Sequence, residues 1–261
     1  MEERNIRLAS DSLWELWQNR SCMDELPAQN RPATRQEGYA IQALLESRSK
    51  YPIFGWKIAA TSSAGQSHIG VSGPMAGRLL KERTHSVGQK ISIDQCLMKV
   101  AEAEFAFRMK SDLPPKEKPY TVKEVLDAVG GLHPAMEIPD SRFSKFAEAG
   151  EAQLIADNAC AHEFVLGHSA HDSWKTIDLI THNVELRATN ARSETGRGSN
   201  VLGDPRAALT WLVNELFDIG TYVKRNQIIT TGTTTNPIPI NPGSEAIADF
   251  GELGSVSAKF Y

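Results

Sequence analysis

The stretch from Lys99 to Arg108, KVAEAEFAFR, constrains the fold of this chain more than any other. Side chains alternate between the two faces of a β-strand. On that basis one face of the stretch is wholly apolar and carries Ala101, Ala103, Phe105 and Phe107. The opposite face carries Glu102 and Glu104, one pleat repeat apart, between Val100 and Ala106. The pattern predicts a strand that presents two carboxylates in the same direction.

Two buried carboxylates this close repel each other, and the usual remedy is a cation or basic partners. A third acidic candidate, Glu137, lies in another short apolar run, Pro134–Asp140. Three carboxylates without a His or Cys partner suit a hard divalent ion, Mg²⁺ or Mn²⁺. The competing interpretation is a solvated face, because most charged side chains are exposed.

The composition places the chain among large-core soluble proteins. It has 261 residues, of which 41% are hydrophobic, which is enough for one domain with an appended helical segment or for two intimate subdomains. A net charge of -4, and the lack of a basic run with interleaved aromatic residues, argue against a nucleic-acid binder. No stretch approaches a membrane span, and the charged N-terminus lacks the apolar core of a signal peptide.

The three cysteines, Cys22, Cys96 and Cys160, are odd in number and far apart. They form neither a disulfide framework nor a CxxC metal pair. Together with the composition, this predicts a cytoplasmic protein.

Periodicity and capping signals predict a few helices. An apolar stripe indicates a helix from about residue 7 to 18. The capping boxes Thr34–Glu37 and Thr121–Glu124 each open a further helix, the second of which is expected to end at Gly130-Gly131. Asp204-Pro205 provides an N-cap and an N1 proline for a helix that reaches about residue 218.

The remaining pattern predicts many short strands. They are expected at 53–59, 91–93, 99–108, 132–138, 163–167, 227–232 and 254–260. Alternation suggests a hairpin over 173–188. Residues 154–158 are expected to form a strand or turn, and residues 192–200 a flexible connection. Because no βαβ rhythm repeats, the class is α+β with a mixed, strongly curved sheet.

Lys57 is unusual because it stands in the middle of a strand that is predicted to be buried. It either reaches the surface with its ammonium group, or lies near the carboxylates and pairs with them or transfers protons. The run Thr233–Thr235 has two interpretations as well: ordinary strand-and-turn chemistry, or the lining of a carboxylate-binding pocket.

Seven ordered segments resemble the 2-keto-4-pentenoate hydratase and oxalocrotonate decarboxylase branch of the fumarylacetoacetate hydrolase superfamily. They span nearly the whole chain: Gly55–Ser62, Gly70–Leu79, Glu102–Phe107, Pro134–Arg142, Ala156–Asn158 with Phe164–Gly167, Val201–Pro205 and Gly251–Ser257. The resemblance implies a mixed β-roll or sandwich with an N-terminal helical region. We expect a helical or α+β region over 1–80 and a catalytic β-roll over 81–261, within one integrated domain.

The resemblance also implies a site. It assigns a Mg²⁺ or Mn²⁺ ion to Glu102, Glu104 and Glu137, and a catalytic role to Lys57. Substrate contacts are predicted for Thr61, Gln66, Cys160, His162 and Thr234. Members of the family typically form dimers or larger oligomers, and some form complexes with other enzymes of their pathway.

The implied activity is hydration of a 2-hydroxy-dienoate in the catabolism of an aromatic compound. Decarboxylation of a 2-oxo-enedioate and hydrolysis of an acylpyruvate carbon–carbon bond are the alternatives, the latter with His68 or His162 as candidate base, and a non-catalytic subunit stays open. Hydratases commonly carry an aspartate where this chain has Met75, and decarboxylase relatives tend to lack it. Cys160 and His162 also depart from the family pattern.

Overall fold

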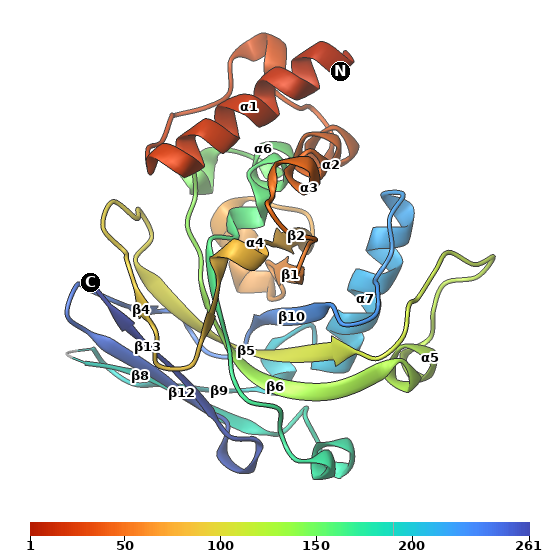
Figure 1. Cartoon of the computed structure of the whole chain (residues 1–261), viewed down its shortest axis with the longest axis vertical. Helices are drawn as coiled ribbons and strands as arrows, with labels where there is room; N and C mark the ends of the chain where they lie inside the picture. The colour runs from red at the N-terminus through yellow and green to blue at the C-terminus, as the bar shows by residue number, and fades with distance from the viewer. Residues whose placement is uncertain (190) are drawn as a thin grey trace.

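The computed structural model describes residues 1–189 and 191–261, which form two sheets and a set of helices (Figure 1). The strands are β1 (Gly55–Ala59), β2 (Met75–Leu79), β3 (Thr84–Ser86), β4 (Lys90–Ile91), β5 (Val100–Met109), β6 (Val129–Ile138), β7 (Glu163–Leu166), β8 (Asn183–Ala188), β9 (Glu194–Arg197), β10 (Ile228–Thr233), β11 (Ile238–Pro239), β12 (Glu245–Asp249) and β13 (Ser255–Phe260). The helices are α1 (Glu3–Asn19), α2 (Arg35–Ala43), α3 (Leu45–Arg48), α4 (Ser63–Ile69), α5 (Val122–Asp127), α6 (Glu151–Ala156) and α7 (Pro205–Asp218).

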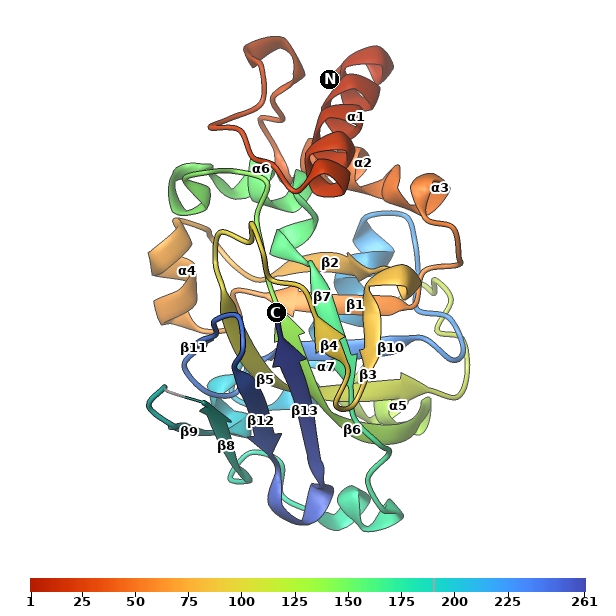
Figure 2. The same ribbon diagram turned by 60° about the vertical axis from the view of Figure 1, so that its left-hand side comes forward.

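The larger sheet is mixed and strongly curved. Its strand order is β2-β1-β10-β5-β6-β7-β3, and β11 pairs with β5 beside this path. The smaller sheet has the order β4-β13-β12-β8-β9. Its strands β12 and β13 cross in front of the larger sheet in Figure 2, while α1 and α2 lie at the top of the molecule. The predicted α+β class with a curved mixed sheet is confirmed.

The main core lies on the apolar face of β5. Phe105 and Phe107 belong to one buried cluster with side chains of α7 and the smaller sheet, including Leu212 and Val256. The ring of Phe105 also packs against Phe250, which directly follows β12. Because side chains alternate between the two faces of β5, no polar side chain lies on this face, and the face can be buried completely. The glutamates of β5 consequently occupy the opposite face.

Capping chemistry fixes the helix starts where the sequence places them. Thr34 and Thr121 each accept a hydrogen bond from the backbone three residues on, and Thr121 completes its capping box with Glu124. Asp204 caps α7 and is followed by Pro205 at the first helical position. The N-terminal helix is also present and buries Ala9 and Leu13 against Ile41 and Phe143.

Several local predictions are wrong. Residues 172–176 form a 3₁₀ turn rather than a strand, and β8 instead pairs with β9, inside the segment predicted to be a flexible connection. Because β9 is a polar edge strand, its pairing left no apolar alternation in the sequence. Residues 151–156 form the helix α6 rather than a strand or turn, and Gly130 and Gly131 lie within β6, beyond the end of α5.

The first 80 residues contribute to the same sheet as the rest of the chain, because β1 pairs with β10 and β2 pairs with β1. The division at residue 80 stays a prediction, and this pairing favours its integrated form. Within the residues that the structure describes, no helix is both long enough and apolar enough to cross a membrane.

Candidate functional site

Strand register brings the three glutamates together. β5 and β6 are antiparallel, with Glu102 directly opposite Glu137 and Glu104 one pleat repeat farther along β5. One carboxylate oxygen from each lies within 4.8 Å of those of the other two. Glu104 and Glu137 are buried, and Glu102 is partly exposed. The cluster therefore has one open side, at Glu102.

Lys57 lies on the same face of the sheet as the glutamates. Gly55 of β1 pairs with Ile228 of β10, and Ile228 pairs with Arg108 of β5. Lys57 is two residues from Gly55 and Glu104 is four residues from Arg108, so both side chains point to the same face of the sheet. The Lys57 Nζ atom is 3.0 Å from Oε1 of Glu137 and donates a hydrogen bond of 2.9 Å to the carbonyl of Ala159. The side chain is 3% exposed. Of the two interpretations of Lys57, the structure shows the buried and paired one.

Glu104 is held by β10. The Thr230 hydroxyl and the Gly232 backbone N–H, the latter at 2.8 Å, both donate to its Oε2. The register of β10 against β5 shifts between Thr230 and Thr233, which directs both donors at one oxygen. The sequence does not point to these two residues, because neither a backbone donor nor a β-bulge leaves a polar motif. Their one sequence signal is the glycine within the threonine-rich run.

Burial and mutual repulsion dominate the electrostatics of the cluster. Burial raises the pKa of Glu102 to about 7, with a further upward contribution from Glu137. Burial likewise raises the pKa of Glu104 and of Glu137, and the neighbouring Lys57 ammonium opposes both shifts. Burial alone would lower the pKa of Lys57, but the surrounding glutamates, Glu137 foremost, raise it instead. Lys57 is therefore an ammonium group at neutral pH.

The cluster is suited to a divalent cation. Oε1 of Glu104 and both carboxylate oxygens of Glu137 are buried without a hydrogen bond of ordinary geometry among the described residues. One ammonium does not balance three carboxylates, and buried anions left in excess are costly. Carboxylate oxygens without nitrogen or sulfur donors match Mg²⁺ and Mn²⁺. Glu102, Glu104 and Glu137 could hold such an ion.

Two of the residues predicted to contact substrate lie beside this cluster. The side chain of Thr61 lies against Gly232, where a Cβ on the glycine would approach the Thr61 hydroxyl to 2.3 Å. Cys160 is buried next to Ala159, and burial raises the pKa of its thiol to about 12, so the thiol is neutral. Both can take part in shaping the pocket, and Cys160 is not a nucleophile in this environment.

Three other predicted contacts have different partners. The Thr234 hydroxyl donates to the carbonyl of Ala103 at 2.8 Å, and Gln66 of α4 donates to the carbonyl of Ala60 at 3.0 Å. His162 accepts a hydrogen bond of 2.8 Å from the indole of Trp17. It lies with Cys96 and Asp140 beneath α1. The structure does not bring His162 into the glutamate cluster, because its side chain faces Trp17 of the N-terminal helix.

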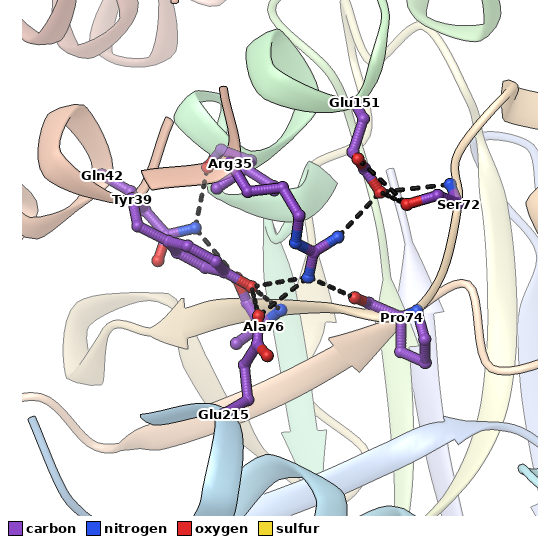
Figure 3. Close-up of polar contacts among 9 residues, drawn as sticks. Arg35, Tyr39, Gln42, Ser72, Pro74, Ala76, Glu151 and Glu215 are labelled. Carbon is purple, nitrogen blue, oxygen red and sulfur yellow. Dashed lines mark hydrogen bonds and ion pairs between the residues drawn. The ribbon is translucent and has the colours of Figure 1, made fainter. Parts of the chain in front are cut away.

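Met75 begins β2 and lies opposite Ala59 of β1, two residues beyond Lys57. Its side chain is buried in an apolar setting. Side chains of α2 satisfy the free edge of β2 next to it (Figure 3): Arg35 donates to the carbonyl of Pro74, and Tyr39 accepts from the backbone N–H of Ala76. The start of β2 is thus fixed in place, with an apolar side chain at the position where the resemblance places an aspartate in hydratases.

Known proteins similar in sequence to this chain include named hydratases and decarboxylases. No family model matches the chain. It is 28% identical over 260 residues to the TodF product hydratase of Pseudomonas putida F1, covering 98% of this chain and 95% of that protein. It is 29% identical over 230 residues to the 4-oxalocrotonate decarboxylase of Pseudomonas sp. CF600, covering 87% and 86%. It is 26% identical over 264 residues to the 2-hydroxyhexa-2,4-dienoate hydratase of Comamonas testosteroni, covering 99% and 98%.

Solved structures similar to this chain include a decarboxylase as well. The 4-oxalocrotonate decarboxylase of Pseudomonas putida G7, complexed with magnesium and adipate, superposes with a TM-score of 0.91 at 25% identity, covering 100% of this chain and 99% of that one. A Yersinia pestis CO92 protein assigned to the fumarylacetoacetate hydrolase family superposes with a TM-score of 0.61 over 81% of this chain and 95% of that one, at 13% identity, and shows the fold. The chain is thus similar over nearly its whole length to 2-keto-4-pentenoate hydratases and oxalocrotonate decarboxylases, and it has the fumarylacetoacetate hydrolase fold.

Proposed function

We propose that this protein is a divalent-metal-dependent hydro-lyase that adds water to a 2-hydroxy-dienoate of the 2-keto-4-pentenoate type, in the breakdown of an aromatic compound. The observation that carries the proposal is the buried cluster of Glu102, Glu104 and Glu137 with Lys57 at its edge. The hydratases among the relatives support it. The proposed substrate is a small molecule, and the proposed assembly is a homo-oligomer.

The glutamates are proposed to hold Mg²⁺ or Mn²⁺, which when bound supplies Lewis-acid polarisation of the 2-oxo acid end of the substrate. The open side at Glu102 is where that end would enter. Lys57 is proposed as the acid/base. Its ammonium has three N–H donors, of which two are directed at Glu137 and the Ala159 carbonyl. The third is free to donate to a substrate oxygen or to deliver a proton to carbon.

The proton balance of the hydration is simple. The dienol loses its hydroxyl proton and gains a proton at the distal end of the diene, which gives an α,β-unsaturated ketone. Water then adds in conjugate fashion, its oxygen to the β-carbon and a proton to the α-carbon. Lys57 can shuttle these protons at Nζ, because an ammonium ion-paired with a carboxylate can give a proton up and recover it.

The second candidate is decarboxylation of a 2-oxo-enedioate. The observation that favours it is Met75, which puts a buried thioether where the resemblance places the hydratase aspartate. Relatives that are named decarboxylases, and the similar decarboxylase structures, also support this candidate. In that reaction a carbon–carbon bond breaks, CO₂ leaves, and a proton takes its place.

One assay separates the two candidates. The loss of dienol absorbance is followed with Mg²⁺ or Mn²⁺, and CO₂ and hydrated product are measured in the same samples. Hydrated product without CO₂ identifies the hydratase, and CO₂ release from the enedioate identifies the decarboxylase. If neither substrate is consumed and no divalent ion binds, the enzymatic proposal fails in favour of a non-catalytic subunit.

A further inference from the structure

A left-handed turn supplies the carbonyl that holds Lys57. Asn158, Ala159 and Cys160 have φ angles of 55°, 51° and 60°. All three residues are buried. Asparagine adopts this conformation more readily than most residues, whereas alanine and cysteine rarely do. Three such residues in succession persist only where the surroundings impose them, which is typical of functional sites.

The side chain of Asn158 provides that constraint. Its Oδ1 accepts a hydrogen bond of 2.7 Å from the backbone N–H of Arg78, and its Nδ2 donates one of 2.9 Å to the carbonyl of the same residue. Because β2 is the edge of the sheet, Arg78 presents both groups on its free side. The amide of Asn158 therefore replaces a neighbouring strand at this one position and binds the turn to β2.

The turn also packs closely against the position opposite Lys57. Gly77 of β2 is directly across from Lys57 of β1. A Cβ on Gly77 would lie 2.5 Å from the carbonyl oxygen of Asn158 and 3.0 Å from Cγ of Lys57. The glycine thus allows the turn and the lysine stem to approach each other. In this arrangement the Ala159 carbonyl faces the Lys57 ammonium at 2.9 Å.

We propose that Asn158 is a positioning residue for Lys57: its two hydrogen bonds to Arg78 fix the left-handed turn so that the Ala159 carbonyl and Glu137 together set the direction of the ammonium. The catalytic consequence rests on the proposed function, since it needs Lys57 as acid/base. The geometric consequence does not, because it concerns only where the ammonium is held.

The test is Asn158→Gly, because glycine accepts φ near +55° without strain and removes only the side-chain clamp. We expect kcat to fall at least about 30-fold with KM within about threefold, since a misdirected proton donor slows the chemical step more than binding. We also expect Lys57 to become more reactive toward reductive methylation, measured by mass spectrometry on the folded protein, while Mg²⁺ affinity stays within about threefold.

Asn214→Ala is the matched control. Asn214 of α7 makes the same pair of bonds to the backbone of Tyr120, with its Oδ1 accepting at 2.8 Å and its Nδ2 donating at 3.1 Å. Removing this clamp is expected to lower stability and to leave kcat and the methylation of Lys57 unchanged. Equal losses of kcat in both variants would show a general effect of stability and overturn the proposal, as would a kcat within threefold of wild type in Asn158→Gly.

Gly77→Ala tests the same contact from β2 and serves if Asn158→Gly does not fold. The added methyl forces the turn away from the sheet, so the same loss of kcat and the same increase in Lys57 methylation are expected. Wild-type kcat together with wild-type protection of Lys57 in Gly77→Ala would overturn the proposal. A wild-type protein that consumes neither substrate would refute the proposed function alone, because methylation reports on the clamp without turnover.

Discussion

The Lys57 ammonium lies 3.0 Å from Oε1 of Glu137, and both side chains are almost entirely buried. A buried ion pair recovers its desolvation cost only when the remaining charges around it are balanced. Here two further carboxylates, Glu102 and Glu104, share the site. The pair therefore belongs to a cluster that is short of positive charge, and this deficit is the physical basis for the proposed metal site.

Removal of a proposed ligand is expected to weaken metal binding strongly. Glu102→Ala and Glu137→Ala should weaken Mg²⁺ affinity by at least about 100-fold and eliminate metal-dependent turnover. This loss exceeds the one expected when a residue that only orients a ligand is removed. Isothermal titration and the dienol assay measure the two effects. Glu163→Gln is the control, because Glu163 is also buried but pairs with Arg83 and His85. Near-normal turnover in Glu102→Ala or Glu137→Ala would refute the ligand assignment.

The raised pKa of Glu102, about 7, predicts how stability depends on pH. The unfolded chain releases this proton near its ordinary value of 4.5, whereas the folded metal-free protein retains it to about pH 7. The folded state thus binds more protons in this window, so the stability of the metal-free protein should fall as pH rises from about 4.5 to 7. Mg²⁺ competes with these protons, so its stabilisation should grow over the same range.

Melting temperatures recorded across this pH range, with EDTA or with saturating Mg²⁺, test this prediction. A metal-dependent increase in melting temperature that is as large near pH 5 as near pH 8 would contradict it.

Substitution of Lys57 should separate catalysis from metal binding. Lys57→Met is expected to lower kcat by about 10²- to 10⁴-fold, the usual contribution of a general acid or base. It should also tighten Mg²⁺ binding, because a positive charge beside the ion is removed. The titration belongs near pH 8.5, since loss of Lys57 raises the pKa of the glutamates further and protons would compete at pH 7. Weaker metal binding at pH 8.5 would argue that Lys57 does not lie beside the ion.

Thr230→Val should weaken the metal site without disturbing the fold. The hydroxyl of Thr230 donates to Glu104 and favours its ionised form, so its loss should raise the pKa of Glu104 and reduce Mg²⁺ affinity about tenfold. Thr231→Val is the matched control, because the hydroxyl of Thr231 donates to the carbonyl of Phe105 instead. It should cost about 1 kcal/mol of stability and leave affinity unchanged. Equal affinities in the two variants would refute the role of Thr230.

Alternation, capping and resemblance were sufficient to predict the fold class, the glutamate strand, the starts of α2, α5 and α7, and the similarity to hydratases and decarboxylases. They failed where pairing is decided between segments. β9 is polar on both faces, so its pairing with β8 left no periodic signal. The apolar part of α6, Leu154–Ala156, is short, and periodicity cannot distinguish helix from strand in such a run.

The sequence by itself determined that two carboxylates and a lysine stand on predicted strands, because side-chain direction follows from the period of a strand. Only the tertiary structure decided that Lys57 meets Glu137, that His162 faces Trp17, and that Asn158 binds the edge of β2. These contacts depend on strand order, on a β-bulge and on left-handed backbone. Such features arise from pairing between residues 80 or more positions apart in the chain, which no local pattern records.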